Sequence, residues 1–332
     1  MPVKSLVTGG AGFIGAHVVR ELLKSGHEVV VLDDLSGGFT DNLPEGCLFV
    51  EGSITDHALL SDLFERHQFD YVYHLAAYAA EGLSHFIRRF NYQNNLIGSI
   101  NLINESVKHK IKCFVFTSSI AVYGKGQLPM TEDLVPAPED PYGVSKFAVE
   151  MDLACAHEMF GLPYIVFRPH NVYGEFQNIG DRYRNVVGIF MNQLMQGKPL
   201  TIFGDGKQTR AFSYIGDIAP VIANCVANTS AHNHVFNIGA DTEMSVNDLA
   251  TEVCKVMDME GSVVHLPARN EVVHAYADHS KVHRIFGKQP QTSLSEGLQR
   301  MAAWAREVGA RKSNTFSGIE ITEKLPPSWL SE

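Results

Sequence analysis

Short hydrophobic runs alternate with longer segments of helical periodicity along the first half of the chain. The runs end in small or polar residues and read KSLVTGG, HEVVVLDD, CLFVEGS, FDYVYHLAA, IKCFVFTSS and LPYIVFRPHNVYG. Between them, apolar positions recur with the period of a helix over residues 12–25, 56–67, 92–109 and 143–160. Nearly continuous apolar runs that alternate with helices predict a parallel sheet with helices on both faces.

After about residue 175 the rhythm loosens. The pattern there predicts helices at about 185–197, 217–228 and 245–257, a strand at 234–238, and a Gly-rich turn at FGDGKQTR. We therefore expect an α/β chain with a doubly wound parallel sheet over 1–175, to which some later segments return, and a smaller C-terminal α/β lobe over 176–312. The tail over 313–332 is rich in Ser, Thr and Pro without a clear period, and is expected to be a docked or mobile extension.

Composition narrows the class of protein without deciding its function. The 332 residues carry a formal net charge of −10 and no block of Lys and Arg, which argues against a broad nucleic-acid surface. No apolar run approaches the length of a membrane-spanning helix, and the N-terminus lacks the pattern of a signal peptide. Five scattered cysteines without a Cys-x-x-Cys pair favour reduced thiols in the cytoplasm. We expect no metal, no nucleic acid and no membrane among its partners.

The first apolar run is followed by glycines in the arrangement of a nucleotide-binding turn. Residues 5–15 read SLVTGGAGFIG, in which Gly9, Gly12 and Gly15 fit G-x-x-G-x-x-G and overlap a G-x-G-x-x-G. Without side chains there, helix N–H groups can reach a pyrophosphate, and the last glycine lets the helix pack closely on the strand. A tight strand–helix turn without a ligand is the alternative interpretation.

A carboxylate follows at the distance that a dinucleotide site requires. Asp33 ends the second strand about 20 residues after the glycines, where it can accept hydrogen bonds from both ribose hydroxyls. A 2′-phosphate would be repelled by this carboxylate, and residues 33–43 contain no Arg or Lys to bind one. The pattern therefore favours NAD over its phosphorylated form.

A second pattern that carries chemistry lies in PYGVSK. Tyr142 and Lys146 stand four residues apart on a helix that Pro141 opens, so both side chains share one face. There the ammonium could stabilise a tyrosinate and lower the pKa of the phenol toward neutrality; a solvated helix face is the alternative. Ser119 ends a strand at the edge of the sheet that faces ligands, where its hydroxyl could share a substrate hydrogen with Tyr142.

With these motifs the sequence resembles the extended short-chain dehydrogenase/reductases, and within them the nucleotide-sugar epimerases and dehydratases. The matching pieces, spread over residues 3–290, are TGGAGFIG, LDDLSGG, YHLAA, NNLIGSINLI, FTSSIAVYG, PYGVSK, FRPHNVYG, IFGDGKQTRAFSYIGDIA and YADHSKVHRIFG. The resemblance implies a Rossmann domain that binds NAD over 1–175, a nucleotide-sugar-binding lobe over 176–312, and a homodimer formed through two helices of each subunit.

The resemblance also implies roles for individual residues. Tyr142 is expected to be the general base, Lys146 its electrostatic partner and a ribose ligand, and Ser119 the second hydroxyl partner. Cofactor contacts are expected from Gly9, Gly12, Phe13, Ile14, Gly15, Asp33, Ser53, Ile54, Leu75, Ala76, Ala77, Asn95, Tyr142 and Lys146. Substrate contacts are expected from Ser119, Tyr142, Asn171, Arg210, Arg269 and Ala275. The alternatives are turn or cap roles for the two asparagines and surface ion pairs for the two arginines.

A reaction is implied as well. Related dehydratases carry an Asp-Glu pair after the Ser/Thr, and related decarboxylases a Glu, whereas this chain has Ile120 and Ala121 there. The expected enzyme is therefore an isomerase, a nucleotide-sugar 4-epimerase that oxidises C4 with NAD, lets the keto-sugar rotate, and returns the hydride to the opposite face. UDP is the commonest nucleotide in the family, but GDP, CDP and dTDP relatives exist, so the base stays open. UDP-glucose/UDP-galactose and the N-acetylhexosamine pair both stay open, because a small Ala275 leaves room for an N-acetyl group.

Two departures from the family pattern keep other functions open. Ser53 stands where many relatives carry Asp against the adenine. Glu81, in YAAEGLS, is either a solvated loop carboxylate or an extra base, and an extra base would allow C3 or C5 epimerisation or an atypical dehydration. A non-catalytic NAD-binding regulatory protein on the same fold is the alternative from another class.

Overall fold

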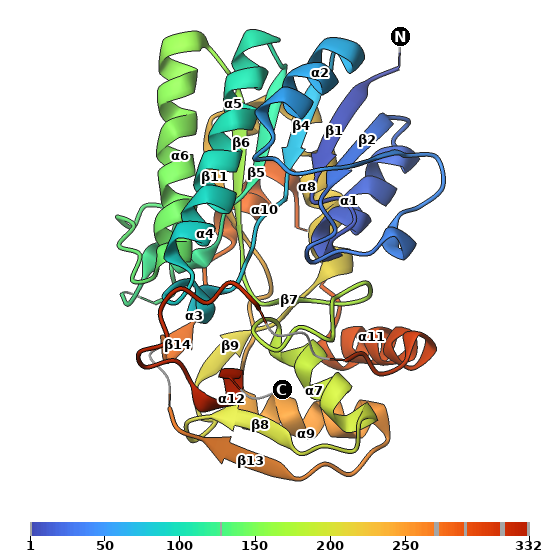
Figure 1. The fold of residues 1–332 in the computed structure, drawn as a ribbon, viewed down its shortest axis with the longest axis vertical. Helices are drawn as coiled ribbons and strands as arrows, with labels where there is room; N and C mark the ends of the chain where they lie inside the picture. Colours follow the sequence, from blue (N-terminus) through green and yellow to red (C-terminus); the bar gives the residue numbers. More distant parts are fainter. Residues whose placement is uncertain (1, 127, 269–271, 289–290, 313–315, 331–332) are drawn as a thin grey trace.

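The computed structural model describes residues 2–126, 128–268, 272–288, 291–312 and 316–330 (Figure 1). Two lobes lie one above the other in this view, and an α/β sandwich forms the upper one. Among the described residues, no helix has the length and apolar character that crossing a membrane would take. The expected α/β class is confirmed.

A seven-stranded parallel sheet forms the middle layer of the upper lobe. Its strands are β1 (Lys4–Thr8), β2 (Glu28–Asp33), β3 (Leu48–Glu51), β4 (Tyr71–His74), β5 (Cys113–Thr117), β6 (Tyr164–Pro169) and β11 (His234–Ile238). The spatial order is β11-β6-β5-β4-β1-β2-β3, so the direction of winding reverses between β1 and β4. Ligands of open α/β sheets bind at the carboxyl ends of the strands beside such a reversal.

Helices cover both faces of this sheet. One face carries α1 (Phe13–Lys24), α8 (Ile215–Asn224) and α10 (Ser280–Phe286), and the other carries α2 (His57–His67), α5 (Gly98–Lys108) and α6 (Pro141–Phe160). Successive strand residues point to opposite layers: Leu6 and Phe114 join one buried cluster, and their neighbours Val7 and Val115 join the other. Strands buried on both faces account for the continuous apolar runs in the sequence.

The lower lobe has shorter strands than the upper lobe, together with helices of ordinary length. They are α7 (Val186–Met195), β8 (Leu200–Phe203), β9 (Thr209–Ala211), β12 (Glu243–Ser245), α9 (Val246–Met257), β13 (Val263–Leu266), β14 (His274–Ala275) and α11 (Leu294–Val308). Strand β9 lies between β12 and β14, and β8 pairs with β13. A short parallel pair of β7 (Val172–Tyr173) and β10 (Ser213–Tyr214) lies between the lobes. Buried residues of the two lobes form one continuous cluster, so the lobes share a core.

Most predicted elements lie within two residues of their observed bounds. The strand at 234–238 is found as predicted, and the helix expected over 92–109 begins with a turn of π-helix at Gln93–Ile97 before α5. The helix expected at 217–228 is shorter, since α8 ends at Asn224 and a 3₁₀ turn follows. Segments after residue 175 do join the upper lobe: β11 pairs with β6, and α8 packs on α1.

The C-terminal tail is docked over its described part, 316–330. The Glu320 carboxylate accepts hydrogen bonds of 2.9 Å from the N–H groups of Arg89 and Phe90, in the first turn of α4 (Arg88–Tyr92). At its other end, Trp329 in α12 (Pro327–Leu330) is buried against Phe203 of the lower lobe. The tail therefore contacts both lobes, and in Figure 1 it is the dark red segment near α3 (Glu81–Ser84).

Candidate active site

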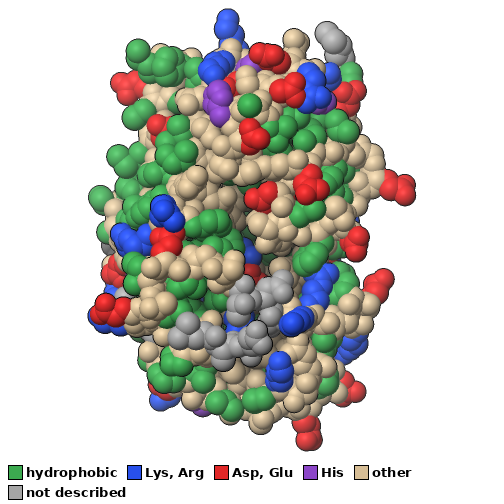
Figure 2. All heavy atoms as spheres, in the orientation of Figure 1, with side chains coloured by type: hydrophobic (Ala, Val, Ile, Leu, Met, Phe, Trp, Pro, Cys, Tyr) green, Lys and Arg blue, Asp and Glu red, His purple; other side chains and the backbone are tan. Residues whose placement is uncertain are grey.

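A cavity of about 510 Å³ lies between the carboxyl ends of the sheet strands and the lower lobe. Its walls combine the glycine turn after β1, the ends of β4, β5 and β6, and residues of α7, β8 and β9. Figure 2 shows a hollow between the two lobes on this face of the molecule. The cavity stands at the winding reversal of the sheet, where the topology predicts a ligand.

The glycine turn leaves backbone where side chains would otherwise stand. A Cβ placed on Gly15 would lie 2.0 Å from the carbonyl oxygen of Gly9, so α1 packs against the turn only with glycine there. Gly12 begins α1 without any side-chain cap, and Gly12, Phe13 and Ile14 line the cavity. The uncapped N–H groups and the helix dipole make this turn a fitting cradle for a pyrophosphate.

Asp33 stands where the sequence places a ribose ligand. Its carboxylate is 8% exposed, lines the cavity, and accepts hydrogen bonds from the N–H groups of Ala11 at 3.0 Å and Leu35 at 2.8 Å. Burial raises the pKa of Asp33, and these hydrogen bonds lower it. Two oxygens fixed by backbone donors still have lone pairs for the hydroxyls of a ribose.

The catalytic candidates are carried by α6 and the end of β5. Asp140 caps α6 by accepting from the Gly143 N–H at 2.9 Å, and this cap fixes the turn that carries Tyr142. Lys146, 2% exposed, donates to the Thr117 carbonyl at 2.8 Å, and its Nζ lies 5.8 Å from the centre of the Tyr142 ring. A hydrogen bond with Ser119 acts on the phenol of Tyr142. Tyrosine, lysine and serine thus meet at the cavity wall.

Burial dominates the electrostatics of this group, which corrects one expectation. In the chain by itself, burial raises the pKa of Tyr142 well above its usual range, and the hydrogen bond with Ser119 lowers it by less. Burial also lowers the pKa of Lys146 to about 7, against the raising effect of Glu150. The ammonium therefore does not bring the phenol to neutrality in the protein alone. A phenolate is stabilised only while Lys146 carries its positive charge, so the two groups titrate as a coupled pair.

Most of the other predicted contacts also line the cavity. These are Gly9, Ile54, Leu75, Ala76, Ala77, Asn171, Arg210 and Ala275. Ile120 and Ala121 line it as well and place apolar side chains next to Ser119. Asn171 has a φ of +42°, and the Arg210 guanidinium donates to the carbonyls of Val272 and Val273 at 2.5 and 2.8 Å. The backbone thus fixes both proposed diphosphate ligands.

Two predicted cofactor residues do not line the cavity. Asn95 is buried and holds the loop after β4, because its side chain accepts from the Tyr78 N–H at 2.8 Å and donates to the Tyr78 carbonyl at 3.1 Å. Ser53 closes a turn by bonding the Thr55 hydroxyl at 2.8 Å. Both residues position neighbouring backbone. Arg269 lies outside the described residues.

Other cavity residues gave no signal in the sequence. They include Tyr78, His85, His170, Asp181, Tyr183, Arg184 and Phe203. The Arg184 guanidinium is paired with Asp181 and lies 4.7 Å over the Tyr78 ring. Its Nη2 is 3.3 Å from where a Cβ of Gly37 would stand, so a cation approaches the turn after β2 from a distant segment. Residues 33–43 themselves contain no Arg or Lys, so the sequence around the turn gave no sign of the Arg184 cation.

Glu81, the predicted extra base, lines the same cavity at the start of α3. Its charge raises the pKa of Tyr142, as does that of Asp140. His74 is fully buried between the hydroxyls of Thr8 and Ser99, at 2.7 Å from each, and is a packed residue. Within the described part of the chain, no group of three or more His, Cys, Asp or Glu side chains is arranged to hold a metal ion.

Comparison with known proteins decides the family. The sequence pattern of the NAD dependent epimerase/dehydratase family matches residues 5–239, well over half of the chain. The chain belongs to this family. The expected resemblance, enzyme class and NAD dependence are thereby confirmed.

Curated and solved relatives cover nearly the whole chain. A putative UDP-glucose 4-epimerase of Methanocaldococcus jannaschii is 35% identical over 307 residues, 91% of this chain and 98% of that protein. The structure of a UDP-glucose 4-epimerase of Thermotoga maritima with UDP-glucose has a TM-score of 0.87 at 35% identity, covering 92% of this chain and 99% of the other. A UDP-N-acetyl-alpha-D-glucosaminuronate decarboxylase of Bacillus cytotoxicus is 30% identical over 93% of this chain and 99% of its own. Relatives of similar identity thus differ in sugar and reaction.

Proposed function

We propose that the chain is a nucleotide-sugar 4-epimerase of the UDP-hexose type, acting on UDP-glucose/UDP-galactose or the N-acetylhexosamine pair. The supporting observation is that Ser119, Tyr142 and Lys146 meet at the cavity while Ile120 and Ala121 present apolar side chains beside them. Dehydration at C6 needs an acid that protonates the departing hydroxide. A site with apolar groups after the serine favours oxidation and reduction at C4 alone.

The cofactor is held by residues already described. The turn from Gly9 to Gly15 suits the pyrophosphate, Asp33 suits the adenosine ribose, and Lys146 suits the second ribose. The chemistry that bound NAD supplies is reversible acceptance of a hydride from C4 of the sugar.

The side chains of the protein remove one proton from the sugar and later return it. Tyr142 removes the proton of the C4 hydroxyl, and Ser119 donates a hydrogen bond to the same sugar oxygen as it becomes a carbonyl. Lys146 pairs its positive charge with the phenolate. After the keto-sugar has turned in the cavity, Tyr142 returns the proton to the C4 oxygen, so the net reaction inverts one carbon and consumes nothing.

The lower lobe and the segment after β6 bind the nucleotide part of the substrate. Asn171 and Arg210 suit the diphosphate, because a guanidinium offers paired donors to phosphate oxygens. The Thermotoga maritima relative was solved with UDP-glucose, and a UDP-glucuronic acid 4-epimerase of Bacillus cereus with UDP-glucuronic acid and NAD. These complexes support a UDP-sugar as the substrate class.

A homodimer is part of the proposal. Helix α6 carries an exposed stripe of Val144, Met151, Cys155 and Met159, spaced as one face of a helix, and Met159 is 75% exposed. Such a stripe suits a second copy of the chain, and light scattering of the wild type and a Met151→Lys variant tests it. The cysteines are free thiols, which supports a reducing, cytoplasmic place of action.

One experiment decides the reaction. The NAD-loaded protein is incubated with a panel of UDP-, dTDP-, GDP- and CDP-sugars in deuterium oxide, and products are identified by NMR. A simple 4-epimerase forms the C4 epimer with no solvent deuterium on carbon. No turnover of any sugar, with NAD still bound, would contradict the proposal and favour a non-catalytic NAD-binding protein.

A second candidate uses Glu81. Its position on the cavity wall and its charge effect on Tyr142 place a carboxylate near the reacting group. A base there could take a proton from the carbon next to a C4 ketone, giving C3 or C5 epimers or an elimination. Deuterium at C3 or C5, lost in Glu81→Gln, would favour this candidate over simple 4-epimerisation.

A further inference from the structure

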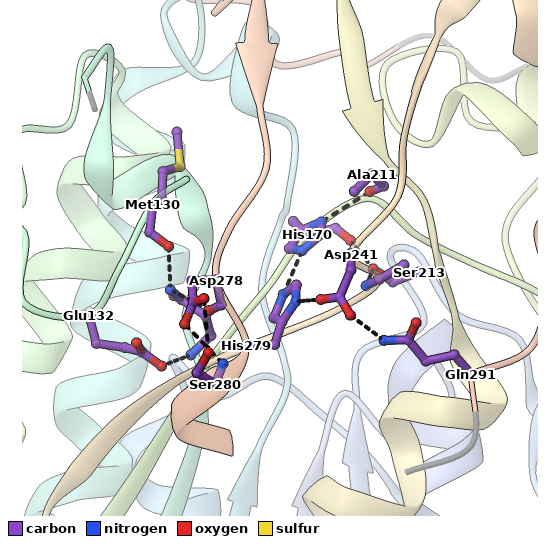
Figure 3. A network of polar contacts seen from close by, with 12 residues as sticks. Met130, Glu132, His170, Ala211, Ser213, Asp241, Asp278, His279, Ser280 and Gln291 are labelled. Carbon is purple, nitrogen blue, oxygen red and sulfur yellow. Dashed lines mark hydrogen bonds and ion pairs between the residues drawn. The ribbon is translucent and has the colours of Figure 1, made fainter. Parts of the chain in front are cut away.

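One polar network joins four of the chain segments that cross between the lobes (Figure 3). The crossings follow β6, join β9 to β10, follow β11, and run from β14 to α10. Each contributes one member of the network: His170, the Ala211 carbonyl, Asp241 and His279. The network thus ties together four of the segments that connect the two lobes.

The network is buried and continuous. His170 and His279 are 3% and 2% exposed, and their Nε2 atoms lie 3.0 Å apart. Nδ1 of His170 donates to the Ala211 carbonyl at 3.0 Å, and Nδ1 of His279 lies 2.6 Å from the Asp241 carboxylate. Gln291 donates to the other carboxylate oxygen at 3.0 Å.

Counting hydrogens fixes the charge of this network. A carbonyl and a carboxylate both accept, so both Nδ1 atoms carry a hydrogen. The Nε2 atoms can bond each other only if one of them also carries a hydrogen. Two neutral imidazoles have two N–H groups, whereas the closed network needs three. When all three contacts are hydrogen bonds, the network therefore holds one extra proton, balanced by the negative charge of Asp241.

The network also abuts the proposed diphosphate site. His170 lines the cavity and directly precedes Asn171, and Ala211 directly follows Arg210. The Ser213 hydroxyl donates to the His170 carbonyl at 2.9 Å, which fixes the same backbone from a second side. A change in the contact between the two rings is therefore expected to displace both proposed phosphate ligands.

We propose that His170, His279 and Asp241 are positioning residues that lock the two lobes through one shared proton and so set the affinity for the nucleotide sugar. The substrate part of this inference rests on the proposed function. The charged groups that act on His279 are Asp241, Asp278 and His283. Without the shared proton, two nitrogen lone pairs face each other at 3.0 Å and the lock is lost.

The direction of the pH dependence follows from burial. Burial lowers the pKa of His279, although Asp241 raises it, and burial holds the pKa of His170 at about 3. The protonated lock is therefore present on the acidic side and is lost as pH rises through the lowered pKa of His279, toward neutrality. The affinity for the nucleotide sugar should fall over the same range.

The test uses the full chain loaded with NAD. A pH titration followed by histidine ¹⁵N NMR should show His279 protonated on both nitrogens at the acidic end, with one proton lost at a pH below the usual histidine pKa. Calorimetry with UDP-glucose should give binding about three- to tenfold weaker at about pH 8 than on the acidic side of this transition, the size of one lost hydrogen bond. Asp241→Asn should bind as weakly at both pH values as the wild type does at pH 8.

Matched variants separate the outcomes. His265→Gln, at an exposed position of β13, should keep the wild-type pH dependence. His279→Gln is a second probe if Asp241→Asn does not fold. A His279 that stays neutral throughout the titration, or unchanged pH dependence in Asp241→Asn, would overturn the proposed role of the shared proton. A protonated His279 with no binding of UDP-glucose at either pH would contradict the proposed function and leave the lock standing.

Discussion

The cofactor half and the substrate half of the cavity are built in different ways. On the cofactor side, each wall is the turn that follows a buried strand, so residues a few positions apart, such as Gly9 and Gly15, act together. On the substrate side, walls come from segments far apart, and bonds such as His170–His279 join residues 109 positions apart. Local patterns therefore define one half, and long-range packing defines the other.

The largest effect is expected where both halves meet, at Tyr142. Tyr142→Phe removes the proton-transfer group and should lower kcat by roughly 10²–10⁴-fold. NAD retention and KM should change little, because the ring remains. Assays with UDP-glucose, and the absorbance of bound NAD, measure the two properties. Tyr71→Phe, on the sheet away from the cavity, is the control, and a Tyr142→Phe enzyme of normal kcat would disprove the assignment.

A change on the cofactor side should abolish NAD binding. Gly15→Ala places a methyl group 2.0 Å from the Gly9 carbonyl oxygen, so α1 must move away from the turn that is proposed to cradle the pyrophosphate. We expect the purified variant to lose its NAD and to melt at a lower temperature. Gly126→Ala, where a Cβ meets nothing within 4 Å, should keep both properties. Full NAD content in Gly15→Ala would contradict the cradle.

These two sites were predictable because the signals were local. A glycine spacing, an acidic strand end and a Tyr-x-x-x-Lys each reflect contacts within one or two turns of chain, as Tyr142 and Lys146 show. The sheet followed for the same reason, since burial on both faces marks every strand of it except the partly exposed edge strand β3. The exceptions, Ser53 and Asn95, hold backbone near the cofactor turns rather than the cavity itself.

The substrate half could not be predicted in the same way. Arg184 reaches the turn of Gly37, and Trp329 reaches Phe203, through the packing of segments that are distant in sequence. No period or spacing in the sequence encodes such a meeting. Even the electrostatics of Tyr142 depend on burial by the assembled lobes, which raises the pKa of its phenol.

The pH dependence of kcat tests that electrostatic coupling. The resting site holds a neutral phenol and, below about pH 7, a charged Lys146. Loss of one proton gives either neutral lysine with phenol or the reactive pair of ammonium and phenolate, and these two forms share the same proton count. At saturating substrate, kcat should therefore rise about tenfold per pH unit below pH 7 and level off above it.

A matched variant identifies the group responsible. Lys146→Arg keeps a positive charge at every pH, so proton loss must then come from Tyr142, whose pKa burial raises. The rising limb should move to higher pH. A profile in Lys146→Arg that levels off at the wild-type pH would assign the limb to another group and remove Lys146 from the coupling.

The smallest effect is expected from the C-terminal tail, which supports the substrate half from outside. The centre of the Trp329 ring lies 5.3 Å from the centre of the Tyr183 ring and 6.3 Å from that of Phe203. Both Tyr183 and Phe203 line the cavity. Trp329→Ala removes this backing, so the two rings gain freedom that substrate binding must then restrict. We expect KM for the UDP-sugar to rise by about two- to fivefold, with kcat and bound NAD nearly unchanged.

Ile321→Ala, in the same tail but 43% exposed, should leave KM unaltered and serves as the control. Loss of NAD from the Trp329→Ala protein would mean that the tail supports both halves, and the contrast between them would be weaker than the geometry indicates. A graded rise in KM alone would show that the substrate walls depend on contacts far outside the sequence motifs. The cofactor walls, fixed by their own strand ends, would then be independent of the tail.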